Sequence, residues 1–150
     1  MRYFGEIPGT YPGQTFANRT ELMLSRIHRP KRAGIGGTQR DGAESIVLSG
    51  GYEDDEDHGA VIVYTGYGGR SVRSGKQVTH QDPTLVRANL ALAVSCRREL
   101  PVRVVRGAEL DSPYAPDEGY RYDGLYRVTE YWQESGKRGY EVWRFRLEKI

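Results

Sequence analysis

Short runs of β-branched and aromatic residues alternate along the chain with segments rich in glycine and polar residues. The runs cover residues 45–48, 61–64, 102–105, 125–128 and 142–145. Runs of this length, bounded by turn residues, predict β-strands. Gly136 and Gly139 lie between the last two runs and predict that a hairpin joins them. The pattern therefore predicts a β core.

A first helix is predicted near the start of the chain. Asn18 is a good N-cap, and Glu21 follows three positions later, which is the spacing of a capping box. Pro30 ends this stretch, and the glycine- and proline-rich residues 4–13 before it predict a loop.

A second helix is predicted to begin at Asp82-Pro83, because an N-cap followed by proline at the first helical position is a typical helix start. Its apolar residues recur at helical spacing, at positions 85, 88, 92 and 96. We expect this face to dock on the core, with Cys96 as a small buried apolar side chain rather than a nucleophile.

These elements predict one domain over residues 1–150 with an α+β fold. The length fits a single domain with a core of its own, and no repeat, low-complexity segment or linker divides it. Two polar, glycine-rich loops, residues 49–59 and 65–70, follow predicted strands. Trp132 and Trp143 flank the predicted hairpin, so we expect them in core or cross-strand packing.

The composition is that of a soluble globular protein, with 37% hydrophobic and 28% charged residues. One cysteine is too few for a disulfide framework or a cysteine-rich zinc site, and it favours a reducing compartment. The chain has no apolar run of membrane-spanning length and does not open with a signal-peptide pattern. We therefore expect no membrane partner.

The charge is distributed unevenly, although the net charge is only +2. Residues 28–32 form a basic run and residues 54–57 an acidic one. The chain could present a basic face and keep carboxylates for one task, or the two runs could be solvated loops. The nineteen glycines and eleven tyrosines suit a protein that contacts flat ligands, and also a plain β-barrel with many turns.

Several kinds of catalytic site are not supported. The three histidines lie far apart without a metal-ligand motif, and a zinc deaminase needs paired cysteines. The chain has no Asp/Glu-x-Lys triplet, and neither asparagine lies between two histidines, as an HNH nuclease requires. Residues 66–69 lack the Lys-Ser/Thr ending of a phosphate-binding P-loop. We predict no catalytic residue, metal or cofactor in this chain.

Tyr52 and Tyr64 each adjoin a glycine-rich loop and could form the walls of a slot. A base flipped out of a duplex loses its stacking, and aromatic walls return about 1–3 kcal/mol per base. Asp55 could accept a hydrogen bond from the amino group of cytosine, while Thr65 and loop N–H groups could donate to its other polar atoms. Taken alone, tyrosines and acidic residues in such positions are more often structural.

Several motifs appear in the order typical of one protein family. The central ones are Ser49-Gly50-Gly51-Tyr52-Glu53-Asp54-Asp55 and Tyr64-Thr65-Gly66-Tyr67-Gly68-Gly69-Arg70. Others lie at residues 4–9, 28–30, 33–35, 101–106, 114–116, 119–126 and 142–144. Their number and order argue against chance. The chain resembles the SRA (YDG) domain, and its compact length is similar to bacterial members fused to HNH nucleases.

The resemblance implies a twisted, partly open β-barrel with helices packed outside it, which grips duplex DNA and flips out a modified cytosine. Tyr52 and Tyr64 would be the pocket walls, Asp55 would hold the cytosine amino group, and Thr65 would contact the other polar atoms. Backbone at Ser49, Gly50 and Gly51 would close the pocket. The motif Tyr122-Asp123-Gly124 would be a turn that holds the fold.

The resemblance also suggests which residues contact the rest of the DNA. Arg29, Lys31, Arg70 and Lys76 would be phosphate contacts, although plain surface charge is an equal alternative for the 28–32 run. Arg32 precedes the Ala33-Gly34-Ile35 motif and would enter the minor groove or meet a phosphate. Family members that sense hemimethylated sites carry an Asn-Lys-Arg finger where this chain has Gly75-Lys76-Gln77. Gln77 would then reach a groove without conferring a hemimethyl preference.

The predicted function is therefore a non-catalytic reader of duplex DNA that contains 5-methylcytosine or a related 5-modified cytosine. The expected setting is the bacterial cytoplasm, in a modification-dependent restriction system. A nuclease domain, covalently linked or associated, and a homodimer of the full-length protein are further expected partners. An alternative is a glycosylase-type enzyme that uses the same pocket with Asp55 as its catalytic carboxylate.

Overall fold

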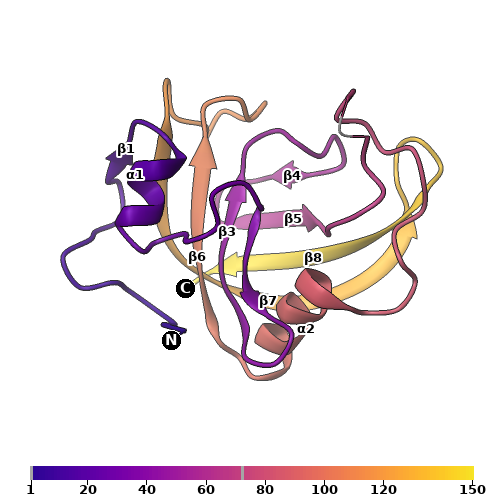
Figure 1. Ribbon diagram of the computed structural model, residues 1–150, viewed down its shortest axis with the longest axis horizontal. Helices are drawn as coiled ribbons and strands as arrows, with labels where there is room; N and C mark the ends of the chain where they lie inside the picture. Colours follow the sequence, from indigo (N-terminus) through magenta and orange to yellow (C-terminus); the bar gives the residue numbers. More distant parts are fainter. Residues whose placement is uncertain (1, 72) are drawn as a thin grey trace.

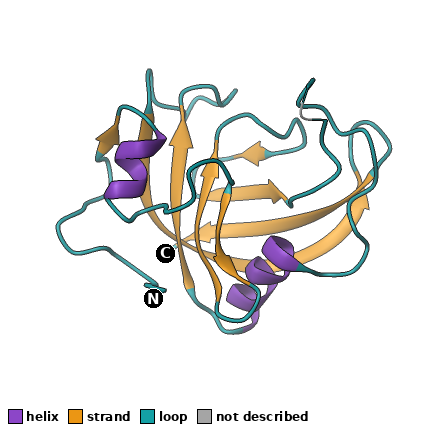
Figure 2. Cartoon of the chain, viewed as in Figure 1, coloured by secondary structure: helices purple, strands orange, loops and turns teal. Residues whose placement is uncertain are grey.

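The computed structural model describes residues 2–71 and 73–150. In this part of the chain, eight strands form one mixed sheet and two helices pack against it (Figures 1 and 2). The strands are β1 (Thr15–Phe16), β2 (Ile35–Thr38), β3 (Gly42–Leu48), β4 (Glu56–Asp57), β5 (Val61–Thr65), β6 (Pro101–Gly107), β7 (Tyr120–Ser135) and β8 (Glu141–Lys149). The helices are α1 (Arg19–Leu24) and α2 (Arg87–Arg97).

The sheet is strongly curved but open. Its strand order is β2-β3-β6-β7-β8-β5-β4, with β1 beside β7. The β3–β6 pair is parallel and the other pairs are antiparallel. Strand β7 pairs in turn with β1, β6 and β8, and register shifts near Val128 and Arg103 bend the ladder. The α+β prediction is confirmed, but the sheet is not a closed barrel, because β2 and β4 remain at its two ends.

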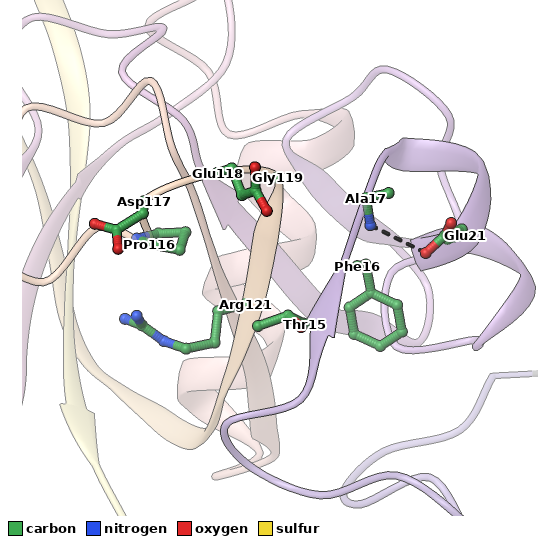
Figure 3. A pocket seen from close by; sticks show the side chains of 9 residues that line it. All are labelled: Thr15, Phe16, Ala17, Glu21, Pro116, Asp117, Glu118, Gly119 and Arg121. Carbon is green, nitrogen blue, oxygen red and sulfur yellow. Dashed lines mark hydrogen bonds between the residues drawn. The ribbon is translucent and has the colours of Figure 1, made fainter.

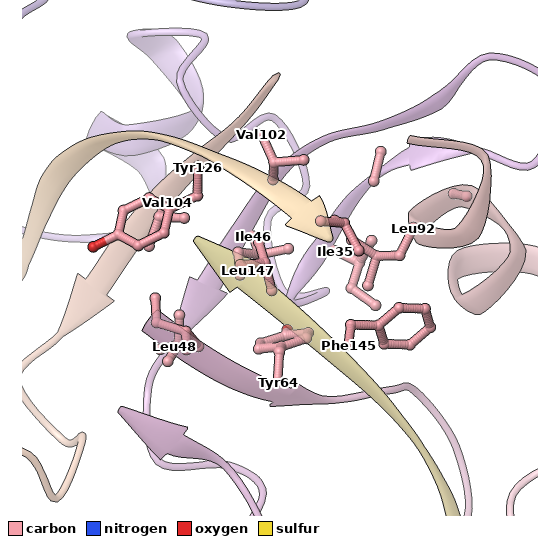
Figure 4. Packing of buried hydrophobic residues seen from close by; sticks show 14 of the residues in the cluster. Ile35, Ile46, Leu48, Tyr64, Leu92, Val102, Val104, Tyr126, Phe145 and Leu147 are labelled. Carbon is pink, nitrogen blue, oxygen red and sulfur yellow. The ribbon is translucent and has the colours of Figure 1, made fainter. Parts of the chain in front are cut away.

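Strand β3 is buried on both faces, and this explains its apolar sequence. Ile46 and Leu48 face the main core, which Figure 4 shows around Tyr64, Phe145 and Leu147. Val47 points the other way, into a second cluster that contains Leu22 of α1. The N-terminal segment and α1 therefore cover one face of β3 and β6, while α2 packs beside the main core on β2, β3 and β7 (Figure 1).

The first helix begins as predicted. The Oδ1 atom of Asn18 accepts a hydrogen bond from the N–H of Glu21 at 2.9 Å. The Glu21 carboxylate accepts from the N–H of Ala17 at 3.0 Å, one residue earlier than in a regular capping box. The helix ends at Leu24, well before Pro30.

The predicted start of the second helix is wrong. Its N-cap is Val86 rather than Asp82, whose side chain instead accepts from the N–H of Thr84 and forms a turn. The segment is fastened to β8, because the Trp143 indole donates to the Asp82 carbonyl and the N–H of Gln81 donates to the Glu141 carbonyl. The apolar stripe itself is confirmed, since residues 85, 88, 92 and 96 all contact the main core.

The five predicted strands and the hairpin are present, and Gly136 and Gly139 form the turn between β7 and β8. Trp143 lies in the main core, whereas Trp132 pairs with Arg144 and is only half-buried. The strands β1, β2 and β4 were not predicted. They are short or rich in glycine and acidic residues, so they lack the apolar runs that mark the others.

The Tyr122-Asp123-Gly124 motif lies inside β7 and is not a turn. Tyr122 is fully buried and donates a hydrogen bond to Glu6, which fastens the N-terminal segment. Asp123 pairs with Arg106 and Arg121. The motif does hold the fold together, but it does so through buried polar contacts.

Candidate nucleic-acid interface

The structure brings Tyr52 and Tyr64 together at one pocket. The pocket has a volume of about 50 Å³ and is lined by Ala33, Gly34, Ile35, Tyr52, Tyr64, Thr65, Tyr67 and Ala88. A space of this size holds little more than water, so a pyrimidine can enter only if the walls move apart. The two tyrosines therefore line one narrow pocket, and its role as a slot for a base stays a prediction.

Tyr64 is the fixed wall. It lies next to the last residue of strand β5 and is only 3% exposed, and its hydroxyl donates to the carbonyl of Gly34 at 3.2 Å. A side chain at Gly34 would collide with this hydroxyl, because a Cβ atom there would lie 2.7 Å from it. Burial raises the pKa of Tyr64 well above its ordinary value, so the phenol stays neutral.

Tyr52 is the half-buried wall. Its hydroxyl accepts a hydrogen bond from the N–H of Gly68 at 3.1 Å, which links the two glycine-rich loops. The guanidinium of Arg70 stacks on its ring at 4.6 Å from the centroid. Tyr52 is only half-buried, and contacts on the loop surface hold it, so it is the wall that can move to admit a ligand.

The four consecutive carboxylates of the acidic run do not form one solvated loop. Each has a different partner. Asp54 accepts from the N–H of Lys137, Asp55 from the N–H of Thr65, Glu56 pairs with Arg144, and Asp57 pairs with Arg106. Of the four, Asp55 is the one that is hydrogen-bonded to a residue lining the tyrosine pocket, Thr65.

Asp55 is held beside the pocket in a low-polarity environment. Its Oδ1 atom accepts from the N–H of Thr65 at 2.7 Å. Burial raises the pKa of Asp55 to about 7, and the hydrogen bond from Thr65 offsets only part of this effect. A buried carboxyl with so high a pKa is typical of a functional site.

The side chain of Thr65 is a second polar group beside the pocket. Thr65 is 1% exposed, and its Oγ1 atom is buried without a hydrogen-bond partner in the part of the chain that the structure describes. A buried hydroxyl is normally hydrogen-bonded. Thr65 is therefore available to a polar ligand in the pocket.

The residues just before Tyr52 do not line the pocket. Gly50 has φ +79°, and a Cβ atom there would lie 2.6 Å from the carbonyl of Glu109. Ser49 packs beside Gly107, and Gly51 packs against the guanidinium of Arg70. Their predicted role in closing the pocket around a base stays a prediction.

The basic run of residues 28–32 is not one continuous surface. His28 is fully buried between Ser45 and the carbonyl of Ala33, and burial lowers its pKa to about 3. Arg29 pairs with the buried carboxylate of Glu44 at 2.9 Å. Lys31 and Arg32 are exposed just before the pocket-lining residues 33–35. These two side chains, and not the whole run, can reach a phosphate near the pocket.

The segment after the second loop folds back as a small hairpin in which Arg70 bridges to Gln77. Lys76 is exposed, as a phosphate contact requires. Gln77, by contrast, is 5% exposed, and its amide donates to the carbonyls of Gly68 and Thr79. Gln77 is directed inward to support the loop, which corrects its predicted place in a DNA groove.

Sequence reasoning missed part of the pocket. Tyr67 lines it from the second glycine-rich loop, and Ala88 lines it from α2. Tyr67 is separated from Tyr64 by only two residues, so its position could have been found from the loop itself. Ala88 could not, because its sequence pattern indicates only a core-facing helix.

A larger pocket, of about 660 Å³, lies away from the tyrosines, between β1, α1 and residues 116–121 (Figure 3). Its carboxylates, Glu21, Asp117 and Glu118, would repel DNA phosphates. Within residues 2–71 and 73–150, no group of three metal-binding side chains occurs, and no helix is long and apolar enough to span a bilayer.

Residues 3–150 match the family model described as the SAD/SRA domain. The chain belongs to the SAD/SRA family. This SRA domain is 45% identical over 166 residues to the E3 ubiquitin-protein ligase UHRF1 of Bos taurus, and 39% identical over 168 residues to UHRF2 of Homo sapiens. Each alignment covers 98% of the chain but only 21% of the relative, so the SRA domain spans about a fifth of these ligases.

Solved structures agree with this assignment. The SRA domain superposes with a TM-score of 0.93 on a modification-dependent TagI restriction endonuclease, at 44% identity, covering 98% of the chain and 52% of that protein. It also superposes on the SUVH5 SRA domain bound to hemimethylated CG DNA, with a TM-score of 0.81 and 42% identity. This alignment covers 99% of the chain and 94% of the SUVH5 chain. Another SUVH5 SRA structure holds fully hydroxymethylated CG DNA, with a TM-score of 0.82.

Proposed function

We propose that this SRA domain binds duplex DNA containing 5-methylcytosine or a related 5-modified cytosine, and that it flips this base into the pocket between Tyr52 and Tyr64. The observation that carries the proposal is the pairing of aromatic walls with Asp55 and the buried Thr65 side chain at one pocket. The DNA complexes of SUVH5, which is 42% identical, support the ligand class.

The pocket chemistry matches the Watson–Crick edge of cytosine. The amino group of the base donates, and Asp55 is the acceptor beside the pocket. The ring N3 and O2 atoms accept, and the buried Thr65 hydroxyl can donate to them. Tyr52 and Tyr64 replace the stacking that the base loses on leaving the duplex.

Loss of the movable wall should weaken specific binding. We expect Tyr52→Ala to cost about 1–3 kcal/mol in binding to a duplex with one 5-methylcytosine, because one stacking face is lost. Binding to the unmodified duplex should change little, since phosphate contacts supply it. Titrations of both duplexes over a series of salt concentrations measure the two effects. Equal affinity of the wild-type domain for both duplexes at every salt concentration would refute the proposed function.

The domain should not prefer hemimethylated over fully methylated sites. The hairpin after Arg70 carries Gly75-Lys76-Gln77 in place of the Asn-Lys-Arg finger, and Gln77, at the position of the finger arginine, is turned inward. We expect the two duplexes to compete equally in a binding assay. A strong hemimethyl preference would show that another side chain, such as Arg32, fills the space that the flipped base leaves in the duplex.

We further propose that the domain is the reading module of a modification-dependent restriction system, in which a nuclease domain or partner cuts the DNA. The similarity to TagI supports this setting, and the SRA domain covers about half of that endonuclease. Plasmids with and without 5-methylcytosine, incubated with the domain joined to its nuclease, test the proposal. Cleavage that does not depend on the modification would contradict it.

A further inference from the structure

Another pocket, rich in arginine, lies beside the N-terminal segment. It has a volume of about 480 Å³ and is formed by Tyr3, Ile7, Pro8, Arg26, Arg29 and Arg103. Among the described residues, its lining contains three guanidinium groups and no carboxylate, and we call it the arginine pocket. It shares no lining residue with the tyrosine pocket. Figure 1 shows the N-terminal segment and α1 on the opposite side of the molecule from α2, which lines the tyrosine pocket.

Arg103, on strand β6, is a buried cation at the base of this pocket. It is 0% exposed, and its guanidinium donates to the carbonyls of Tyr3, Gly5 and Ile27 at 2.6, 2.8 and 2.8 Å. These partners are neutral. The carboxylate that pairs with it is Glu44, whose Oε1 atom lies 3.9 Å away. Burial lowers the pKa of Arg103, as expected where a cation is incompletely compensated.

The Glu44 carboxylate is shared with other arginines. Glu44 is fully buried, and its Oε1 atom lies 3.3 Å from Arg2 and 2.9 Å from Arg29. Its Oε2 atom accepts from the N–H of Tyr3 at 3.0 Å. One carboxylate therefore faces three guanidinium groups, although buried charges are normally paired.

Positive charge remains in surplus when the other charged groups nearby are counted. Four positive and two negative side chains gather here, on Arg2, Arg26, Arg29 and Arg103 and on Glu44 and Glu6. Glu6 is already bonded by the Tyr122 hydroxyl. The surplus of two charges matches a phosphomonoester, which carries about −1.5 to −2 at neutral pH. Guanidinium groups bind phosphate oxygens in a bidentate geometry.

The backbone at Arg26 indicates that its side chain is retained for a purpose other than folding. Arg26 follows Ser25, the C-cap of α1, and has φ +70°. Glycine is the usual residue at this position, because a side chain is strained there. The Arg26 side chain is nevertheless exposed and lines the arginine pocket. Departures from local preference are expected where a side chain serves a functional site.

The rest of the lining is apolar and aromatic. The backbone of Tyr3 is fixed by Glu44 and Arg103, while its side chain is 48% exposed and lines the pocket with Ile7 and Pro8. The volume is typical of small-molecule sites, which span about 300–1,000 Å³, and exceeds what a phosphate ion fills. A flat ring attached to the phosphate can stack on Tyr3.

We propose that the arginine pocket is a second ligand site, which binds a phosphomonoester that carries a flat ring. This is the chemistry of a nucleoside monophosphate, either free or at the 5′ end of a DNA strand. The phosphate contacts the guanidinium groups, and the ring stacks on Tyr3. The site does not depend on base flipping, because the two pockets share no residue.

Calorimetric titration of the domain without DNA tests the site, with deoxyadenosine 5′-monophosphate, deoxyadenosine and inorganic phosphate as probes. We expect one site for the monophosphate, no detectable binding of the nucleoside, and binding of inorganic phosphate that is weaker by about tenfold or more. Tyr3→Ala should bring the monophosphate and inorganic phosphate to similar affinities, because the stacking face is lost.

Arg26→Gly tests the charge without endangering the fold. It removes one guanidinium and suits the positive φ, so the melting temperature should not fall. Monophosphate binding should weaken by about tenfold or more. Arg40→Gly is the matched control, because the Arg40 side chain is 92% exposed and does not line the pocket. Equal monophosphate affinities of these two variants would overturn the proposal, as would wild-type binding of the nucleoside as tight as that of the monophosphate.

Competition with an unmodified duplex, with or without 5′-phosphates, identifies the source of the ligand. If only the phosphorylated duplex displaces the monophosphate, the site takes a strand end. If neither duplex displaces it, the site takes a free nucleotide. Equal displacement by both duplexes would mean that the arginines contact the DNA backbone, and the proposal would be wrong.

Discussion

Asp55→Ala is expected to weaken binding to modified DNA by about 1–3 kcal/mol, by analogy with other specific base contacts. Asp55 is the acceptor beside the pocket, and without it the cytosine amino group is buried unpaired. The carboxylate also rejects thymine, whose carbonyl oxygen would face it at the same position. Because thymine already carries a 5-methyl group, the variant should discriminate less between modified cytosine and a mismatched thymine.

The control for this variant follows from the structure of the acidic run. Asp54 and Asp57 are unsuitable, because each accepts buried or half-buried hydrogen bonds that hold the fold. Glu53→Ala changes the charge equally and removes only a surface pair with Arg138, whose side chain is 40% exposed. If Asp55→Ala and Glu53→Ala weaken modified-duplex binding to the same small extent, Asp55 contributes only loop charge.

The same carboxyl should lower the stability of the free domain at neutral and alkaline pH. Its folded pKa of about 7 lies above the ordinary 3.8, so the native state binds more protons between these values. Stability from this group is therefore complete below pH 4 and is lost as the pH rises to 7. We expect Asp55→Asn, which does not titrate, to raise the free energy of unfolding at pH 8 by about 1–3 kcal/mol. This range is smaller than the full pKa shift would give, because the Asp55 side chain is partly exposed to solvent.

Urea unfolding of the wild type and of Asp55→Asn at pH 5 and pH 8 measures this effect. The stability difference should be larger at pH 8. A variant that loses specific DNA binding while it gains stability would show that Asp55 is retained for recognition rather than for folding. If the two proteins differ in free energy of unfolding by the same amount at both pH values, the Asp55 carboxyl has an ordinary pKa.

The strands that could be predicted from the sequence are those with continuous apolar runs. Strands β1, β2 and β4 lack such runs and could not be predicted. β2 contains Gly36 and Gly37, and β4 consists of Glu56 and Asp57. These strands exist because neighbouring strands pair with them, which is a tertiary effect on weak local propensity. The start of α2 was misplaced because Asp82 and Pro83 suit a turn as well as a helix, and contacts with β8 decide between the two.

The pocket was predictable only in its central residues. Tyr52, Asp55, Tyr64 and Thr65 came from two motifs, and the structure places them together. The burial of His28 and the inward direction of Gln77 were not visible, because charge and polarity in a sequence do not show which side chains find buried partners. The buried amides of Gln81 and Asn89 are likewise visible only once distant segments meet.

The largest effect on stability is expected from Arg106→Met. Arg106 is 3% exposed and binds both oxygens of Asp57, at 2.7 and 2.8 Å, as well as Asp123 at 2.8 Å. It also donates to the carbonyl of Gly59. This side chain thus joins β6 to β7 and to the turn that follows β4.

Removing the guanidinium leaves the Asp57 carboxylate in a site where only 3% of its side chain is exposed. Breaking one side of a buried ion pair typically costs about 3–5 kcal/mol, because the remaining charge is not compensated. We expect a loss of this size in the free energy of unfolding of Arg106→Met, measured with urea at pH 7. Arg146→Met is the control, since its pair with Glu148 is 42% and 45% exposed and should contribute less than about 1 kcal/mol.

A double variant shows whether the unpaired charge is the cause. If it is, Asp57→Asn added to Arg106→Met should recover part of the lost stability, because the amide tolerates burial better than a carboxylate. The N–H of Gly59 contacts Oδ1 and can still donate to the amide oxygen there, while the Ser112 hydroxyl, which contacts Oδ2, can accept from the amide NH2 group. Asp57 lies two residues from Asp55. Arg106→Met alone should therefore also make the position of Asp55 beside the pocket less well defined and weaken binding to modified DNA. Equal losses in the single and double variants would instead assign the cost to the lost packing of the Arg106 side chain.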